Sequence, residues 1–456
     1  MKTMTLAAAS LAMSGAFLLN FDTAFAKGPL DVETGQSPLV LVKESATKID
    51  LTDFPFGLEE GTSKNVELSF EQNIALPEHE GSVGLNYSVL LPSLTVEKDG
   101  DDEVTVTFPD EYTISMTFEE DGENVTFDID GKAENQVMTF ERDGDRMTYT
   151  GSADAFSISL AAPEQAKEEG IDFLFTMTGK GLSIDGAGAA EQDWSDLQAL
   201  NVSYEYVLDE SILEATGIDD SGQEFEFSGS TGVVEATGKI GEGRLEGRSE
   251  MNDFAFQILQ PLPIEASIGL FTTEFGMPTE PSPKPQGIKY LIGAEDIVLD
   301  DFIWGLMDPN SAFPRDLNNI LIDVEMQAML MVSLLDPAAM VEIENSDVPP
   351  ILPTGVQIKS IAFDGLGLTV DATGEGELNG TQPEGEAFIS IKGLSEFVGS
   401  AVEAGLFGQQ ESLMIEGMAG QLGKEGDDGA LLFDIKTDGG MLNVNDAPIM
   451  PIPGFE

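Results

Sequence analysis

Residues 103–118, which read EVTVTFPDEYTISMTF, alternate between apolar and polar side chains in two short runs. The first run extends from Val104 to Phe108 and the second from Tyr112 to Phe118, with Thr and Ser at the positions between. Because successive side chains of a β-strand point to opposite faces of a sheet, the alternation gives each strand one apolar and one polar face. This pattern is typical of antiparallel sheets.

The same alternation recurs along the chain on both sides of this stretch. It is found at residues 125–129, 156–160, 202–208, 225–227, 254–258 and 264–270. Asp-Gly pairs favour tight hairpins, because Gly readily adopts positive φ and Asp tolerates it. Such pairs occur at Asp99-Gly100, Asp121-Gly122, Asp130-Gly131, Asp143-Gly144 and Asp438-Gly439. We therefore predict a meander of short strands between residues 99 and 144, without the fixed repeat length of a solenoid or propeller.

Helical patterns are few and come late in the sequence. We predict helices over residues 300–307, 394–406 and 411–421, and strands again over residues 430–436 and 441–444. Residues 394–406 carry the clearest apolar stripe, at spacings of three and four. The stripe consists of Leu394, Phe397, Val398, Ala401, Val402 and Leu406. The predicted fold is mainly β, a large curled antiparallel sheet or sandwich with a few short helices mostly in the C-terminal third.

The N-terminus has the layout of a secretory signal peptide. Lys2 precedes an uncharged apolar run over residues 6–19, and an Ala-Phe-Ala sequence ends at Ala26. The apolar run of about 14 residues is shorter than the roughly 20 that a membrane-spanning helix needs. We predict that residues 1–26 are a signal peptide cleaved before Lys27, which places the mature protein in the periplasm or outside the cell.

We predict that residues 27–456 form one continuous β-rich domain, and a division into two lobes near residues 276–287 is an open alternative. The Pro-rich segment at residues 278–286 fits either a linker between lobes or a long hairpin loop. After the signal peptide, the most apolar window covers residues 320–335 and contains two acids. We therefore expect no membrane span in the mature chain.

The chain is strongly acidic and contains no cysteine. Asp and Glu number 83 against 21 Lys and Arg, which gives a formal net charge of −62. Such a charge repels nucleic-acid phosphates and argues against a nucleic-acid partner. The acids are spread along the chain, which favours adaptation to a salty exterior over a role in collecting cations.

Few residues offer recognisable chemistry, and we assign no catalytic, cofactor-binding or metal-binding residue. The single histidine, His79, lies between acids in a segment with Pro and Gly, which is typical of a solvated loop. The acids Asp99, Asp101 and Asp102 lack the spacing of an EF-hand loop, although a looser calcium site at this hairpin is an open alternative.

Hydrolysis of glycosides requires only two carboxylates, and an acidic chain has many. Carbohydrate sites usually display aromatic side chains for stacking, yet only Trp194 and Trp304 are present as tryptophans. We expect both tryptophans to be packing residues.

The second half of the chain, residues 200–456, resembles an uncharacterised alphaproteobacterial family catalogued as domain of unknown function 2125. The resemblance rests on WGLMDP at 304–309, FPRD at 313–316, FDGLGL at 363–368, a Gly-rich strand at 373–379, the helix at 394–406 and GGMLNVN at 439–445. In that family the closing turn is more usually Asn-Gly, whereas Asp446 stands here. The resemblance implies no activity, because the family has no established one.

The pattern of the strands and the sequence at the end of the chain also resemble those of AsmA-type envelope proteins. The long curved sheets of those proteins carry lipids in an apolar groove. We therefore predict a non-enzymatic envelope protein that binds an apolar or lipid ligand, or an envelope component, on one sheet face. Three alternatives stay open: an apolar face closed into a dry core, a cation-dependent surface or scaffold protein, and an extracytoplasmic hydrolase with paired carboxylates.

Overall fold

A computed structural model describes residues 40–43, 48–50, 55–75, 82–120, 123–168, 170–190, 201–219, 221–335, 349–379, 382–438 and 440–452. The predicted signal peptide, His79 and Trp194 lie outside these residues. Within them, no helix combines the length and the apolar composition that crossing a bilayer requires.

The predicted fold class is confirmed. The structure is 67% strand and 12% helix, with a large antiparallel sheet and four short helices, three of them in the C-terminal half. The described helices are α2 (Glu164–Glu168), α3 (Asp301–Met307), α5 (Leu394–Ala404) and α6 (Gln409–Leu422). Helix α5 ends two residues before the predicted end, because Gly405 takes the left-handed conformation at φ 82° and ends the helix.

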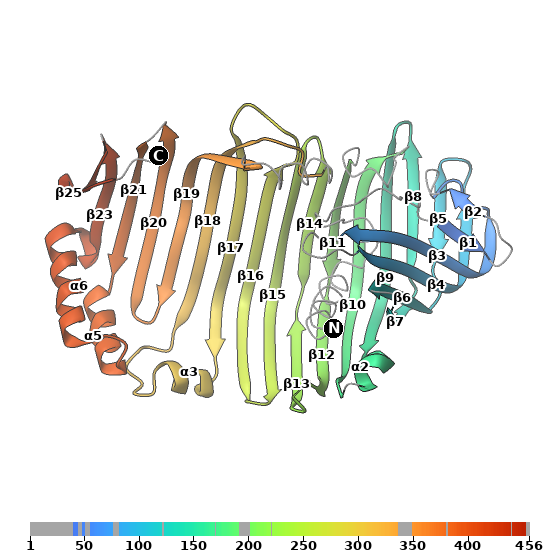
Figure 1. Cartoon of the computed structure of the whole chain (residues 1–456), viewed down its shortest axis with the longest axis horizontal. Helices are drawn as coiled ribbons and strands as arrows, with labels where there is room; N and C mark the ends of the chain where they lie inside the picture. Colours follow the sequence, from blue (N-terminus) through green and yellow to red (C-terminus); the bar gives the residue numbers. More distant parts are fainter. Residues whose placement is uncertain are drawn as a thin grey trace. The chain divides into compact units, whose positions relative to one another are not determined.

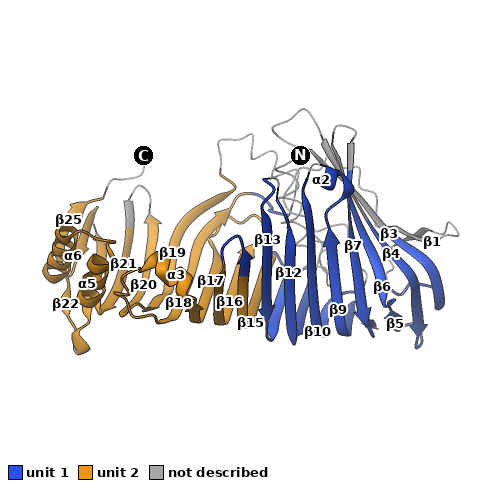
Figure 2. Ribbon diagram, turned by 90° about the horizontal axis from the view of Figure 1, so that it is seen from below, with its two compact units in different colours: residues 1–243, 258–262, 332–348 blue, residues 244–257, 263–331, 349–456 orange. Residues whose placement is uncertain are grey.

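The chain forms two compact units (Figure 2). Unit 1 comprises residues 1–243, 258–262 and 332–348, and unit 2 comprises residues 244–257, 263–331 and 349–456. The prediction of one continuous domain with a division near residues 276–287 stays a prediction.

Unit 1 is built from long strands, several of which pair with two short strands end to end. Strand β4, for example, pairs with β5 near its C-terminal end and with β6 near its N-terminal end. The strands are β1 (Val40–Lys43), β2 (Lys48–Asp50), β3 (Gly61–Ala75), β4 (Ser82–Lys98), β5 (Glu103–Thr107), β6 (Glu111–Glu120), β7 (Glu123–Glu134), β8 (Val137–Asp143), β9 (Arg146–Ala161), β10 (Asp172–Ala189), β11 (Val202–Leu208), β12 (Glu210–Ile218), β13 (Glu224–Thr231) and β14 (Val234–Gly241).

The predicted meander over residues 99–144 is only partly correct. Gly100 and Gly144 have φ of 79° and 61° and lie in the turns that connect β4 to β5 and β8 to β9, as predicted. Asp130 and Gly131, in contrast, lie inside β7. A Cβ at Gly131 would come within 2.1 Å of the Tyr112 ring, so glycine is needed there for close packing and not for a turn.

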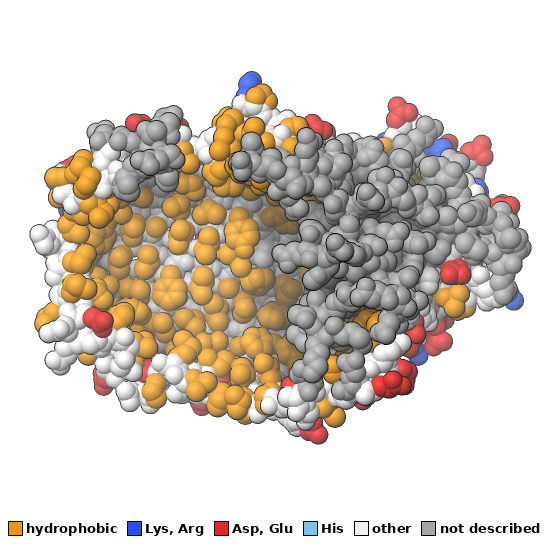
Figure 3. All heavy atoms as spheres, in the orientation of Figure 1, with side chains coloured by type: hydrophobic (Ala, Val, Ile, Leu, Met, Phe, Trp, Pro, Cys, Tyr) orange, Lys and Arg blue, Asp and Glu red, His pale blue; other side chains and the backbone are white. Residues whose placement is uncertain are grey.

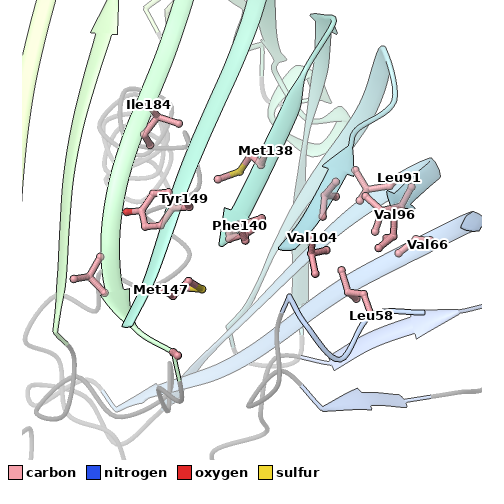
Figure 4. Packing of buried hydrophobic residues seen from close by; sticks show 14 residues of the cluster. Leu58, Val66, Leu91, Val96, Val104, Met138, Phe140, Met147, Tyr149 and Ile184 are labelled. Atoms are coloured by element: carbon pink, nitrogen blue, oxygen red, sulfur yellow. The ribbon is translucent and has the colours of Figure 1, made fainter. Parts of the chain in front are cut away.

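Unit 1 buries many of its apolar side chains in a hydrophobic core. Val66 and Leu91 from β3 and β4 lie beside Val96 and Val104 (Figure 4), and Val66 is fully buried. At full burial, each such side chain stabilises the fold by roughly 1.5–3 kcal/mol. The alternation first recognised at residues 103–107 thus points its apolar side chains inward, as predicted.

Unit 2 is an antiparallel meander in which each long strand pairs with the next along the chain (Figure 1). The Pro-rich segment belongs to the connection between β16 and β17, which pair with each other. The strands are β16 (Ile264–Pro278), β17 (Gln286–Leu299), β18 (Leu317–Leu330), β19 (Ile351–Gly365), β20 (Leu368–Asn379), β21 (Gln382–Lys392), β22 (Lys424–Glu425), β23 (Leu431–Asp438), β24 (Met441–Val444) and β25 (Ala447–Pro451). Strand β15 (Arg244–Gln260) contributes residues 244–257 to unit 2.

Candidate apolar binding face

The strand register in unit 2 places apolar side chains in rows across the sheet. Residues directly opposite each other in an antiparallel pair have their side chains on the same face. From β17 through β18, β19, β20 and β21 to β23, four rows of paired residues share one face. We call this surface the apolar face.

The rows contain no charged residue. They are Ala294–Ile320–Phe363–Val370–Ile391–Leu431, Ile292–Ile322–Ile361–Ala372–Ile389–Phe433, Tyr290–Val324–Ile358–Gly374–Ala387–Ile435 and Ile288–Met326–Val356–Gly376–Gly385–Thr437. Phe271, Thr273 and Phe275 of β16 extend the face by one further strand.

The apolar face is open in much of its extent. Tyr290 is 50% exposed, Val356 is 44% exposed and Ile322 is 37% exposed. Figure 3 looks onto this face and shows hydrophobic side chains gathered over the unit 2 strands, with charged side chains at the margin. Large exposed patches of this kind mark ligand-binding or interaction surfaces, because leaving apolar area in water is unfavourable.

A β-bulge in β19 keeps the apolar face continuous. Val324 of β18 pairs with Ile358 and Asp323 pairs with Ser360, so Lys359 has no opposite residue. Ile358 and Ile361 are three residues apart, so in a regular strand without a bulge the period-two alternation would place them on opposite faces. The bulge restores the phase and keeps both isoleucines on the apolar face.

Three glycines form a recess in the apolar face. Gly374, Gly376 and Gly385 lie next to one another on β20 and β21. A Cβ at Gly385 would come within 2.5 Å of the Glu375 carbonyl oxygen, whereas a Cβ at Gly376 would meet nothing closer than 3.6 Å. Because these three positions have no side chain, the apolar face is lower there than at the larger side chains around them.

The opposite face of the same strands carries charges in pairs. Lys289 contacts Glu274 at 2.6 Å, and Lys359 contacts Glu325 at 2.7 Å. The hydrogen bond from Lys359 lowers the pKa of Glu325, and the same bond raises the pKa of Lys359. The charged side chains of these strands therefore lie on one face of the sheet, opposite the apolar face.

Helix α3 and the turn after it are held by two carboxylates. Asp300 accepts a hydrogen bond from the Ile303 amide at 2.8 Å and acts as the N-cap. Asp308 is 2% exposed and accepts from the Phe313 amide at 2.8 Å, which lowers the pKa of Asp308. Trp304 is 4% exposed, which confirms its predicted packing role.

Neither a metal-ligand cluster nor a buried pair of carboxylates occurs among the described residues. No three Asp, Glu or His side chains among them come together as metal ligands, and this applies to Asp99, Asp101 and Asp102. Asp308 is the only carboxylate among them that is fully buried, so they hold no buried carboxylate pair for glycoside hydrolysis.

Sequence reasoning identified one-sided strands but not which unit leaves its apolar side open. The bulge at Lys359 and the glycine recess were also missed, although the odd spacing of Ile358 and Ile361 is a visible signal for the bulge. Comparison of the chain with family models, with curated proteins and with solved structures finds no match. The resemblance to domain of unknown function 2125 and to AsmA-type proteins stays a prediction.

Proposed function

We propose that this protein is a non-enzymatic envelope protein that binds the acyl chains of lipids on the apolar face of unit 2. The observation that carries the proposal is the set of four uncharged rows that cross six strands in register while several of their side chains stay exposed.

The chemistry of the apolar face suits an acyl chain better than a polar ligand. Its rows offer methyl, methylene and aromatic groups, and the few polar groups are hydroxyls such as those of Tyr290 and Thr437. Ligand sites for polar molecules instead place several hydrogen-bonding groups around the ligand. Each methylene removed from water on this face contributes about 0.8 kcal/mol.

Export forms the second part of the proposal. It rests on the signal-like sequence at residues 1–26, which lies outside the described residues. A lipid-binding protein with a cleaved signal would meet its ligands in the membranes of the envelope.

The proposal is tested with two variants that each place a carboxylate on an exposed apolar position. Val356→Glu changes the apolar face, where Val356 is 44% exposed. Phe388→Glu changes the opposite face, where Phe388 pairs with Asp434 and is 47% exposed. The first measurement is the binding of a fluorescent phosphatidylcholine, used below its critical micelle concentration. The second is mass spectrometry of the lipids extracted from protein purified under native conditions.

We expect wild-type protein to carry co-purified lipid and to bind the probe. Val356→Glu should weaken probe binding by about tenfold or more, because a carboxylate in contact with hydrocarbon must be desolvated. Phe388→Glu should bind within about twofold of wild type. The proposal would be contradicted if the wild-type protein purified without lipid and did not bind the probe. Equal loss of probe binding in both variants would also contradict it.

The alternative of a cation-dependent scaffold has a direct test. Thermal unfolding is measured with calcium and with a chelator at matched ionic strength. A specific calcium site would raise the midpoint with calcium, since a ligand that binds only the folded state stabilises it. We expect equal midpoints.

A further inference from the structure

Helix α6 presents an exposed apolar surface that packs against nothing in the described structure. Leu413 is 70% exposed, Met414 is 59% exposed and Met418 is 55% exposed. A Cβ added at Gly417 or Gly420 would find no atom within 4 Å, which shows that this side of the helix is open. Ala419 is the one buried residue of the helix.

The exposed apolar residues of α6 lie on one side of the helix. Residues advance about 100° each around a helix, which places Leu413, Gly417 and Met414 on the side opposite Ala419. Met418 lies at the edge of this side. The remaining positions of the open side are Gln410, Gln421 and Gly420, so the surface carries no charge. We call it the α6 outer surface.

The α6 outer surface belongs to an element that adjoins the apolar face. At the C-terminal end of α6, a Cβ at Gly423 would lie 3.2 Å from the Phe433 ring and 3.3 Å from Leu431. Phe433 and Leu431 are members of the apolar rows on β23. The C-terminal end of α6 therefore adjoins the apolar face.

The charge of the protein decides which partner suits this surface. Helices α5 and α6 contain Glu396, Glu403, Glu411 and Glu416 and no Lys or Arg. Helices that bind anionic membranes carry Lys and Arg beside their apolar side, and the net charge of −62 adds a long-range repulsion from such membranes. The same repulsion opposes pairing of two copies of this chain.

We propose that the α6 outer surface docks on lipid bilayers whose headgroups carry no net charge, and so brings the apolar face to its lipid source. This inference deepens the proposed function and rests on it. Leu413, Met414 and Met418 would enter the boundary between headgroups and acyl chains, where apolar side chains are stabilised.

The test is co-sedimentation of the purified chain with phosphatidylcholine vesicles. Two double variants remove the apolar contact: L413E/M418E adds charge, and L413S/M418S does not. Phe388→Glu is the matched control, because it places one carboxylate on an exposed apolar position away from α6. These side chains are largely in water, so the variants should fold, which circular dichroism checks.

We expect both double variants to lower vesicle partitioning by about tenfold. Phe388→Glu should stay within about twofold of wild type. Adding phosphatidylglycerol to the vesicles should weaken wild-type binding at low salt, and about 0.5 M NaCl should restore it. Wild-type protein that does not sediment with phosphatidylcholine vesicles, or double variants that sediment as wild type does, would overturn the inference.

A second measurement separates this inference from the proposed function. Binding of the monomeric fluorescent phosphatidylcholine reports the apolar face alone. L413E/M418E should retain this binding while losing vesicle association, and Val356→Glu should show the reverse. If monomeric lipid never binds but vesicle docking depends on Leu413 and Met418, the docking surface stands and the lipid-carrying role fails. If self-association in sedimentation velocity depends on the same residues, a second copy occupies the surface and the inference fails.

Discussion

Asn445 connects three segments of unit 2 through one side chain. Its amide group donates to the Leu422 carbonyl at 2.6 Å and to the Leu432 carbonyl at 2.8 Å, and its oxygen accepts from the Asp434 amide at 2.9 Å. Asn445 also has φ 51°, a conformation that Asn tolerates better than most residues. One side chain therefore holds the end of α6 against β23.

Replacing Asn445 by Ala should destabilise the protein by about 2–3 kcal/mol, because three hydrogen bonds are lost and the positive φ becomes strained. The neighbouring Asp446 also has a positive φ but is exposed. Asp446→Asn should therefore change stability by less than about 0.5 kcal/mol. Denaturant unfolding monitored by circular dichroism compares the two variants. Equal stability of Asn445→Ala and wild type would show that these hydrogen bonds are not formed in solution.

At the scale of single elements, β19 shows how a β-bulge keeps the apolar side chains of a strand on one face of the sheet. Val356 and Ile358 precede the bulge, and Ile361 and Phe363 follow it. Both pairs face the same way because the bulge accommodates the extra residue, Lys359, between them. The bulge, and not the period of two alone, therefore sets the face that each pair occupies.

Deleting Lys359 should change the free energy of unfolding by less than about 1 kcal/mol beyond the effect of Lys359→Ala, because deletion converts the bulge to regular strand and leaves Ile358 and Ile361 on the apolar face. Both variants lose the ion pair with Glu325, so they are matched in that respect. The same denaturant experiment, combined with binding of the fluorescent phosphatidylcholine, measures the difference. A deletion that destabilises the protein much more than Lys359→Ala does, or that abolishes lipid binding, would contradict this account of the bulge.

At the scale of the whole molecule, the balance between burial and charge dominates. The chain carries 83 acids against 21 basic residues, and the observed ion pairs of unit 2 neutralise only a few of them. Like charges repel more strongly in the compact state than in the expanded unfolded chain. Stability should therefore depend on how well the solvent screens these charges.

Raising NaCl from about 0.05 M to about 0.5 M should increase the midpoint of thermal unfolding by about 5 °C, because the Debye length falls from about 14 Å to about 4 Å. Tetramethylammonium chloride at equal ionic strength serves as the control and should give a similar increase. A midpoint that is constant or falls with salt would contradict the prediction that charge repulsion limits stability.

Much of the fold could be predicted from local patterns. The alternation at residues 103–107 and the stripe at residues 394–406 depend only on the period of a strand and of a helix, so both elements form, although the helix ends two residues early. The prediction of a turn at Asp130-Gly131 was wrong. These residues lie inside a strand, where Gly131 packs closely against the Tyr112 ring of a neighbouring strand. Such a contact is invisible along the chain because it joins residues nearly 20 positions apart.

The amino-acid sequence alone was enough to establish a β-rich, acidic protein with one-sided strands, since these properties follow from composition and from the spacing of neighbouring residues. Tertiary structure decided which strands bury their apolar sides, as in unit 1, and which leave them open, as in unit 2. It also decided where the glycine recess and the exposed side of α6 lie. These features arise from pairing and packing between distant segments, and no local pattern specifies which segments meet.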